Sequence, residues 1–343
     1  MAGQSDAFFV QDHKRRLMQA VIIAGGKGTR LLPLTYGSPK PMLPLLERPF
    51  LRWMVDRCQQ AGITDILMNI RYHADQIQAY FGDGSDFGVQ IRYVIERTAL
   101  DTAGAMKLAE PFYTGEPLVV FNADILTDLD LKALMAAHEQ TQAQATLALA
   151  RVADPTAFGL VELSQADGAL ASESLAVQAI HAFREKPSAA EAAQLGIDTI
   201  NAGTYVLNPS IFEQYPVDQP LSFERTVFPE LLAQQQRMTG MVWEGYWMDL
   251  GTPAKYYQGN LDILTGAMPY PLEQIATEHH PGVWVMPSAT VDDQAQLEGP
   301  CFIGDRVYLG PQAQIPAGAI VGANSWLNRP LAPGIYAPGT LAV

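Results

Sequence analysis

One stretch near the start of the chain, "VIIAGGKGTRLLPLTYGSPKPMLPL" from Val21 to Leu45, holds residue types suited to binding an anion. An apolar run ends in a double glycine, and glycine lacks the side chain that would keep a phosphate or a base away from backbone N–H groups. Arg30 is a planar fork of donors and Lys40 a compact charge, and both suit polyphosphate oxygens. No Asp or Glu occurs in residues 13–46, although the chain has a net charge of −14. Chance could leave such a gap, but with the glycines it favours an anionic small ligand.

Two aspartates at the ends of predicted strands suit a metal ion. Asp124 follows the buried run "PLVVFNA", and Asp249 follows the aromatic run "GYWM". Because ligands of parallel sheets bind outside the carboxyl ends of the strands, both carboxylates are expected at that edge. Mg²⁺ prefers carboxylate and phosphate oxygens and is the predicted cofactor. Each residue also has a structural interpretation, since Asp124 could cap its turn and the run before Asp249 suits a core.

The elements that must position these residues follow from alternating strand-like and helix-like segments. Short apolar or alternating runs predict strands over residues 20–24, 63–70, 89–96, 117–124, 145–152, 158–163, 179–187 and 201–208. Amphipathic patterns predict helices over residues 49–62, 74–81 and 102–110, the first with an apolar face of Leu51, Met54, Val55 and Cys58 and a stop at Gly62. Strands that alternate with helices build βαβ units, so we expect an α/β fold with a mostly parallel, mixed sheet.

The last quarter of the chain carries a different pattern, with a strict period of six. A large aliphatic residue recurs at every sixth position: Val285, Val291, Leu297, Ile303, Leu309, Ile315, Val321 and Leu327. Small or modest residues follow four positions after the first seven: Ala289, Ala295, Cys301, Val307, Ala313, Ala319 and Ser325. This hexapeptide repeat predicts a short parallel β-helix with three hexads per coil and the large residues inside.

Length and composition limit the class of protein. With 343 residues, two domains are expected. The acidic net charge argues against general nucleic-acid binding, which needs basic surface. No apolar run is long enough to span a bilayer, and the first residues lack the pattern of a signal peptide, so we expect no membrane association. Cys58 and Cys301 are far apart in sequence and suit a reducing cytoplasm.

Several motifs, taken in order along the chain, resemble the sugar-nucleotide pyrophosphorylases, the nucleotidyltransferases that act on sugar 1-phosphates. "GGKGTRLLPLT" with "PKPMLPL" resembles the family signature, "LDTAGAM" its base-contacting turn, and "FNADIL" its metal-aspartate strand end. "FREKP" resembles the sugar-phosphate lysine motif, "NAGTYVLNPSIF" and "FERTVFPEL" the substrate-side segments, and "GYWMDLGTPAKYYQGN" the second metal-aspartate motif. The resemblance covers about residues 19–321. It implies a Rossmann-like nucleotidyltransferase domain followed by a left-handed β-helix.

The resemblance also implies roles for individual residues. The nucleotide would lie against Ala24, Gly25, Gly26, Gly28 and Thr29, with Asp101 and Gly104 beside the base. The β- and γ-phosphates would be held by Arg30 and Lys40, and Mg²⁺ by Asp124 and Asp249. The sugar phosphate would bind Lys186, and the sugar would contact Gly159, Glu185 and Asn201. The catalytic set implied in this way is Arg30, Lys40, Asp124 and Lys186.

The implied reaction joins a nucleoside triphosphate to a sugar 1-phosphate and releases pyrophosphate. "PKPMLP" and "FREKP" look closest to mannose-1-phosphate guanylyltransferases, so GTP and mannose 1-phosphate are the expected substrates. Glucose 1-phosphate with UTP or dTTP is the alternative. Ala123 and Asp101 depart from the family, which usually has glycine at both positions. The Asp101 carboxylate could accept hydrogen bonds from guanine or face water, which leaves the choice of base open.

Two other classes of function are weighed against this one. A catalytically silent homologue that binds a nucleotide sugar would have no reason to keep the five charged residues Arg30, Lys40, Asp124, Lys186 and Asp249. An acyltransferase acting through the β-helix would need a histidine base, and residues 282–343 contain none.

The expected domain organisation has five parts. These are an extension (1–17), the catalytic domain (18–265), a linker (266–281), the β-helix (282–330) and a tail (331–343). An apolar solenoid end left bare would be sticky, so we expect a homo-oligomer.

Overall fold

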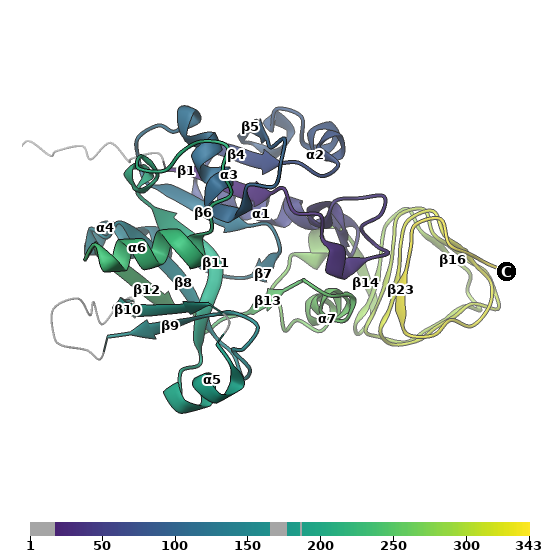
Figure 1. Ribbon diagram of the computed structural model, residues 1–343. Coiled ribbons are helices and arrows are strands. Elements are labelled where there is room, and N and C mark those ends of the chain that lie inside the picture. The colour runs from purple at the N-terminus through teal and green to yellow at the C-terminus, as the bar shows by residue number, and fades with distance from the viewer. Residues whose placement is uncertain (1–17, 165–176, 186) are drawn as a thin grey trace, which may run out of the picture.

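The domain that carries the candidate site residues is built on a nine-stranded sheet (Figure 1). The computed structural model describes residues 18–164, 177–185 and 187–343. Across the sheet the strand order is β5-β4-β1-β6-β11-β8-β12-β10-β9. The strands are β1 Gln19–Ala24, β4 Asp65–Ile70, β5 Gln90–Ile95, β6 Leu118–Asn122, β8 Ala145–Arg151, β9 Gly159–Leu163, β10 Val177–Glu185, β11 Thr199–Leu207 and β12 Met238–Val242.

The first half of this sheet is parallel, which gives its strands a shared edge. β1 runs parallel to β4 and β6, and β4 runs parallel to β5. In register, Ala24 lies opposite Ile70, which in turn lies opposite Ile95. The strands therefore end side by side, and the residues that follow them emerge at one edge: Gly25, Arg71, Glu96 and Ala123.

The second half of the sheet differs from the mostly parallel arrangement that we expected. β11 is antiparallel to β6 and β8, and β10 is antiparallel to β9 and β12, while β8 and β12 are parallel. Parallel neighbours need a crossover connection, usually a helix. The strand-like runs between residues 145 and 185 have no helical pattern between them, and that absence already favoured antiparallel pairing.

Helices cover the sheet close to where the sequence patterns predict them. The α-helices are α1 Phe50–Ala61, α2 Ala74–Phe81, α3 Asp101–Ala109, α4 Leu131–Thr141, α5 Ala189–Leu195, α6 Phe228–Ala233 and α7 Pro253–Leu264. Two short sheets complete this part, one of β2 Pro44–Leu45 with β3 Arg48–Pro49 and one of β7 Ile125–Thr127 with β13 Trp247–Asp249. Among the described residues, no helix combines the length and the apolar character that a membrane crossing requires.

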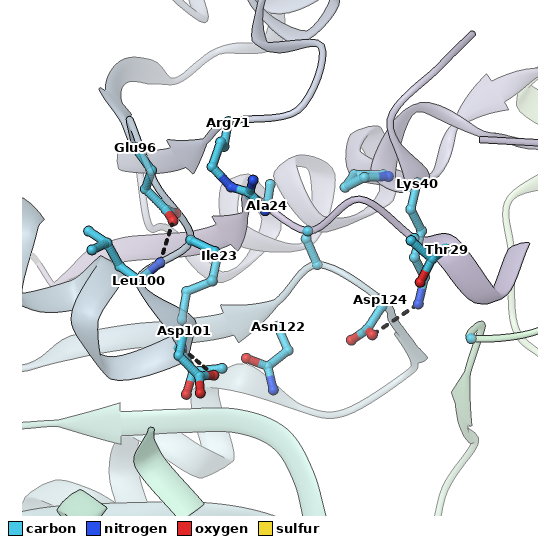
Figure 2. A pocket seen from close by; sticks show the side chains of 18 of the residues that line it. Ile23, Ala24, Thr29, Lys40, Arg71, Glu96, Leu100, Asp101, Asn122 and Asp124 are labelled. Carbon is cyan, nitrogen blue, oxygen red and sulfur yellow. Dashed lines mark hydrogen bonds and ion pairs between the residues drawn. The ribbon is translucent and has the colours of Figure 1, made fainter. Parts of the chain in front are cut away.

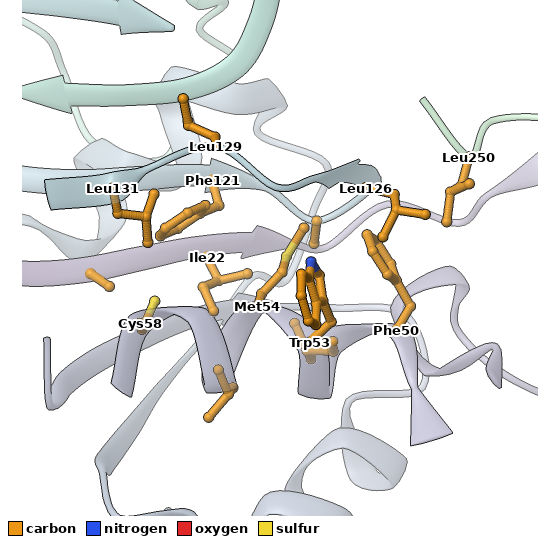
Figure 3. Packing of buried hydrophobic residues seen from close by; sticks show 14 of the residues in the cluster. Ile22, Phe50, Trp53, Met54, Cys58, Phe121, Leu126, Leu129, Leu131 and Leu250 are labelled. Atoms are coloured by element: carbon orange, nitrogen blue, oxygen red, sulfur yellow. The ribbon is translucent and has the colours of Figure 1, made fainter. Parts of the chain in front are cut away.

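Helix α1 shows why the amphipathic pattern was a reliable guide. Leu51, Met54 and Cys58 are all buried, and Figure 3 shows Met54 and Cys58 packed beneath the sheet with Ile22 of β1. The helix ends at Gly62, whose φ of 86° lies in the left-handed region that glycine adopts without strain. Burial raises the pKa of Cys58 to about 12, so this thiol belongs to the core and is not a nucleophile.

The C-terminal part of the chain forms a coil of short parallel strands. Val283 pairs with Cys301, Thr290 with Tyr308, and Gln296 with Gln314, eighteen residues on each time, as three hexads per coil require. The large residues of the repeat form the interior cluster. The strands are β15 Val283–Val285, β16 Thr290–Val291, β17 Gln296–Leu297, β18 Cys301–Ile303, β19 Tyr308–Leu309, β20 Gln314–Ile315, β21 Ala319–Val321, β22 Trp326–Leu327, β23 Gly334–Tyr336 and β24 Leu341–Ala342.

The coil extends beyond the limits taken from the hexapeptide pattern. β23 and β24 pair with β21 and β22, so residues 331–343 continue the coil and are not a separate tail. The spacing there shortens to fifteen residues, Ala319 to Gly334, which ends the strict period of six in the sequence. At the other end, β14 Thr277–His280 lies within the expected linker and pairs with β15.

The coil contacts the loop that carries Lys40. Glu47, at the turn between β2 and β3, accepts a hydrogen bond from the backbone N–H of Asp305 at 3.3 Å. Leu46 donates to Asn260 of α7 at 2.7 Å, and Tyr257 of α7 donates to the carbonyl of Gly318 at 2.8 Å. The loop therefore contacts both α7 and the coil, which also contact each other (Figure 1).

Glu47 predicts a pH-dependent stability at this contact. Burial, with the nearby Asp305 carboxylate, raises the pKa of Glu47, while backbone hydrogen bonds and Arg306 oppose the shift. A raised folded-state pKa adds stability below the unfolded pKa of about 4.3, and that stability is lost as pH rises through the folded-state value. Glu47→Gln should therefore gain stability relative to the unsubstituted protein between about pH 4 and pH 8. Urea denaturation at both pH values measures the difference, and a difference independent of pH would contradict the expectation.

Candidate functional site

A cavity of about 400 Å³ opens at the carboxyl edge of the parallel strands (Figure 2). We call it the sheet-edge pocket. Residues predicted from the sequence line much of it: Ala24, Gly25, Gly26, Gly28, Thr29, Arg30, Lys40, Asp101 and Asp124. The structure thus brings together most of the predicted nucleotide and phosphate residues.

Two glycines in the turn after β1 allow neighbouring side chains to pack against its backbone. A Cβ on Gly25 would lie 2.6 Å from Oε1 of Glu96. Gly28 has a φ of 62°, and a Cβ there would lie 2.9 Å from Cβ of Lys40. These glycines let the Glu96 carboxylate and the Lys40 chain approach the β1 backbone closely.

Lys40 and Asp124 line the charged end of the pocket, and Asp249 lies beside Lys40 without being one of the lining residues. The Lys40 ammonium lies 2.9 Å from Asp124 and 3.7 Å from Asp249, and its side chain is only 11% exposed. Arg30, largely exposed, lies 4.0 Å from Asp249. β7 pairs with β13, and the N–H of Leu250 donates to the Asp124 carbonyl at 2.9 Å. This pairing brings together two aspartates that are 125 positions apart in the sequence.

The two carboxylates fit a divalent cation. Burial, and then the Asp124 charge, raise the pKa of Asp249, while Lys40, Lys255 and Arg30 lower it. Its Oδ1 is buried without a hydrogen-bond partner among the described residues. The described residues contain no group of three or more His, Cys, Asp or Glu that could hold a metal. A cation here would complete its shell with water and phosphate oxygens, as Mg²⁺ does.

The residues that the sequence analysis missed include three polar ones that line the pocket: Arg71, Glu96 and Asn122. Arg71 and Glu96 are the first residues after β4 and β5, and Asn122 is the last residue of β6. Polar residues at the carboxyl ends of predicted parallel strands were the available signal. Burial raises the pKa of Glu96, and the backbone N–H of Leu100 and the charge of Arg71 partly offset this rise. Oδ1 of Asn122 is buried with no hydrogen-bond partner in the described residues.

The base-side turn gives the exposed Asp101 a partner that the sequence analysis did not consider. Asp101 has a φ of 62°, in the region that glycine favours, and aspartate tolerates this region better than most residues. Its carboxylate accepts a hydrogen bond from Arg225 at 2.6 Å. Gly104 is not among the residues that line the pocket; a Cβ there would lie 2.6 Å from the carbonyl oxygen of Gln219. A role for Gly104 beside the base stays a prediction.

The predicted sugar-side residues lie on neighbouring strands outside the lining of this pocket. Gly159 of β9 pairs with Glu185 of β10. Asn201 of β11 donates to the Tyr205 hydroxyl at 2.9 Å, and its Oδ1 accepts from the N–H of Gly203 at 3.0 Å. Lys186 falls outside the described residues, so its role stays a prediction.

The sequence matches known proteins over most of its length. Residues 19–266 match the family model described as nucleotidyl transferase. The chain is 36% identical over 306 residues to a mannose-1-phosphate guanylyltransferase of Mycobacterium tuberculosis, a match that covers 89% of this chain and 79% of that protein. It is 29% identical over 334 residues to a UTP–glucose-1-phosphate uridylyltransferase of a Synechocystis species, covering 89% of this chain and 81% of that protein.

The fold is similar to a solved structure of HddC from Yersinia pseudotuberculosis in complex with GMP-PN. The TM-score is 0.56 and the sequence identity 26%, over 71% of this chain and 98% of that one.

Proposed function

Because the chain belongs to the nucleotidyl transferase family, we propose that it makes GDP-mannose and pyrophosphate from GTP and mannose 1-phosphate. The coarser activity, nucleotidyl transfer to a sugar 1-phosphate, is that of the family and of the relatives above. The substrates proposed are those that the name of the Mycobacterium tuberculosis relative implies.

The residues of the charged end would do positioning work in this reaction. A phosphate oxygen of the sugar 1-phosphate attacks the α-phosphorus of the nucleoside triphosphate. The bond between the α-phosphorus and the oxygen that bridges it to the β-phosphate breaks, and pyrophosphate leaves. Arg30 and Lys40 would bind the departing phosphates, and Asp124 and Asp249 would hold Mg²⁺. Bound there, Mg²⁺ would neutralise charge on the reacting phosphates. Little covalent work falls to the side chains, so orientation and charge neutralisation carry the catalysis.

One observation carries the proposal that the base is guanine: the buried carboxylate of Glu96 beside Gly25 in the sheet-edge pocket. A carboxylate is an acceptor-only group, and guanine presents two neighbouring donors, N1–H and N2–H, to it. Adenine presents an unprotonated N1 at that edge, which a carboxylate repels. Asp101 is a poorer candidate for this contact, because Arg225 already occupies its carboxylate.

We propose the remaining parts of the function from the family. Lys186 binds the sugar phosphate, and Gly159, Glu185 and Asn201 contact the sugar. The catalytic domain (18–265) is Rossmann-like and the C-terminal coil is left-handed. The enzyme works in the cytoplasm. It forms a homo-oligomer, a proposal supported by the exposed apolar side chains of Trp326 and Leu341, which are neighbours on β22 and β24 of the coil.

The test is pyrophosphate release with Mg²⁺ over a grid of GTP, UTP, dTTP and ATP against mannose 1-phosphate and glucose 1-phosphate. We expect turnover of GTP with mannose 1-phosphate to exceed every other pair. Turnover of UTP or dTTP with glucose 1-phosphate would replace the proposal by the activity named for the Synechocystis relative. Binding of a nucleotide sugar by folded protein, without turnover of any pair, would indicate a silent homologue.

A further inference from the structure

Arg71 is a charged residue of the sheet-edge pocket that has no role in the proposed reaction steps. It follows β4 directly and lines the pocket. Its Nε is buried and has no hydrogen-bond partner among the residues that the structure describes. An arginine cannot shed its charge at neutral pH, and a buried donor left unpaired costs stability. Such a group points to a ligand that completes its hydrogen bonds.

The position of Arg71 separates it from the phosphate-binding residues. Figure 2 shows its guanidinium on the side of the pocket that also holds Glu96 and Leu100, away from the ammonium of Lys40 and from Asp124. It is close enough to Glu96 to act on the pKa of that carboxyl, yet within the described chain the two side chains form no ion pair within 4.0 Å. A fork of donors and a pair of acceptor oxygens therefore line the same end of the pocket without satisfying each other.

We propose, on the basis of the proposed guanylyltransferase function, that Arg71 is a specificity-determining residue that donates hydrogen bonds to O6 and N7 of guanine. Arginine makes this bidentate contact with guanine in nucleic-acid recognition. Glu96 accepts from N1–H and N2–H on the adjoining edge, so the two residues together satisfy four polar positions of one base. Adenine would turn its N6 donor toward Arg71, and the pyrimidines have no N7 to accept from it.

The test uses nucleotides that lack one contact each, with mannose 1-phosphate as acceptor. 7-Deaza-GTP replaces N7 by a carbon, and ITP lacks the N2 amine. In the unsubstituted enzyme we expect 7-deaza-GTP to lower kcat/KM by about 5- to 50-fold relative to GTP, mainly through KM. In Arg71→Met, kcat/KM with GTP should fall by a similar factor relative to the unsubstituted enzyme. Replacing GTP by 7-deaza-GTP should then lower kcat/KM of this variant no further. The penalty for ITP should persist in Arg71→Met, because the N2 contact belongs to Glu96.

Two controls keep the outcomes distinct. Arg97→Met removes the same charge from an exposed residue next to Glu96 and should leave all three nucleotides unaffected. Equal use of GTP and 7-deaza-GTP by the unsubstituted enzyme would overturn the inference without any variant, even if Arg71→Met failed to fold. An equal penalty for 7-deaza-GTP in the enzyme and in Arg71→Met would also overturn it. Failure to use GTP at all would instead refute the proposed guanylyltransferase function.

Discussion

Asp124→Asn should lower kcat/KM for nucleotidyl transfer by about 10²- to 10³-fold, with the fold intact. The substitution keeps the size of the side chain and removes one of the two negative charges proposed to hold Mg²⁺. It also leaves Lys40, at 2.9 Å, without its nearest anionic partner. Neither change disturbs the core, because Asp124 lies at the pocket surface and its side chain is about one-third exposed.

Pyrophosphate release at saturating and limiting Mg²⁺ measures this effect. The loss should come with a higher Mg²⁺ concentration for half-maximal rate. Asp86→Asn provides the control, since Asp86 is exposed on the same domain and does not line the pocket, so its removal should change neither quantity. Full activity of Asp124→Asn at the same Mg²⁺ requirement would remove Asp124 from the proposed metal site.

Lys40→Met should produce a second loss of comparable size, about 10²- to 10³-fold in turnover, by a different route. The Lys40 ammonium is proposed to bind the departing phosphates, and methionine keeps the length of this largely buried side chain but not its charge. Without nucleotide, however, the ammonium sits between the carboxylates of Asp124 and Asp249 and opposes a divalent cation there. Lys40→Met should therefore bind a divalent cation more tightly than the unsubstituted protein while turning over more slowly.

Titration of the nucleotide-free protein with Mn²⁺, followed by electron paramagnetic resonance, separates these two effects. Lys132→Met, on the exposed face of α4, is the control for loss of a lysine charge. Weaker Mn²⁺ binding in Lys40→Met would mean that Lys40 organises the carboxylates and does not compete with the metal. Unchanged turnover would exclude Lys40 from the phosphate site.

The sequence alone predicts binding residues and turns wherever they lie together in one segment of the chain. The double glycine, Arg30 and Lys40 lie within a single stretch, and the turn conformation that they need follows from glycine's lack of a side chain. The face of α1 and its stop at Gly62 follow from helical periodicity and from the left-handed φ of that glycine. The eighteen-residue register of the coil follows from a period of six, because a repeated unit stacks on copies of itself.

The tertiary structure alone decided which distant residues meet. Arg71 and Glu96 share a pocket because β4 and β5 end level with β1, an alignment set by strand order and register that no local pattern encodes. The sequence analysis expected Asp249 and Asp124 at one edge, but only the tertiary structure shows that the pairing of β13 with β7 brings them together. The carboxylate of Asp101 could not be assigned in advance, because its partner Arg225 lies 124 residues away. Residue type and spacing determine what a segment can do, whereas long-range packing determines which side chains are left facing the ligand.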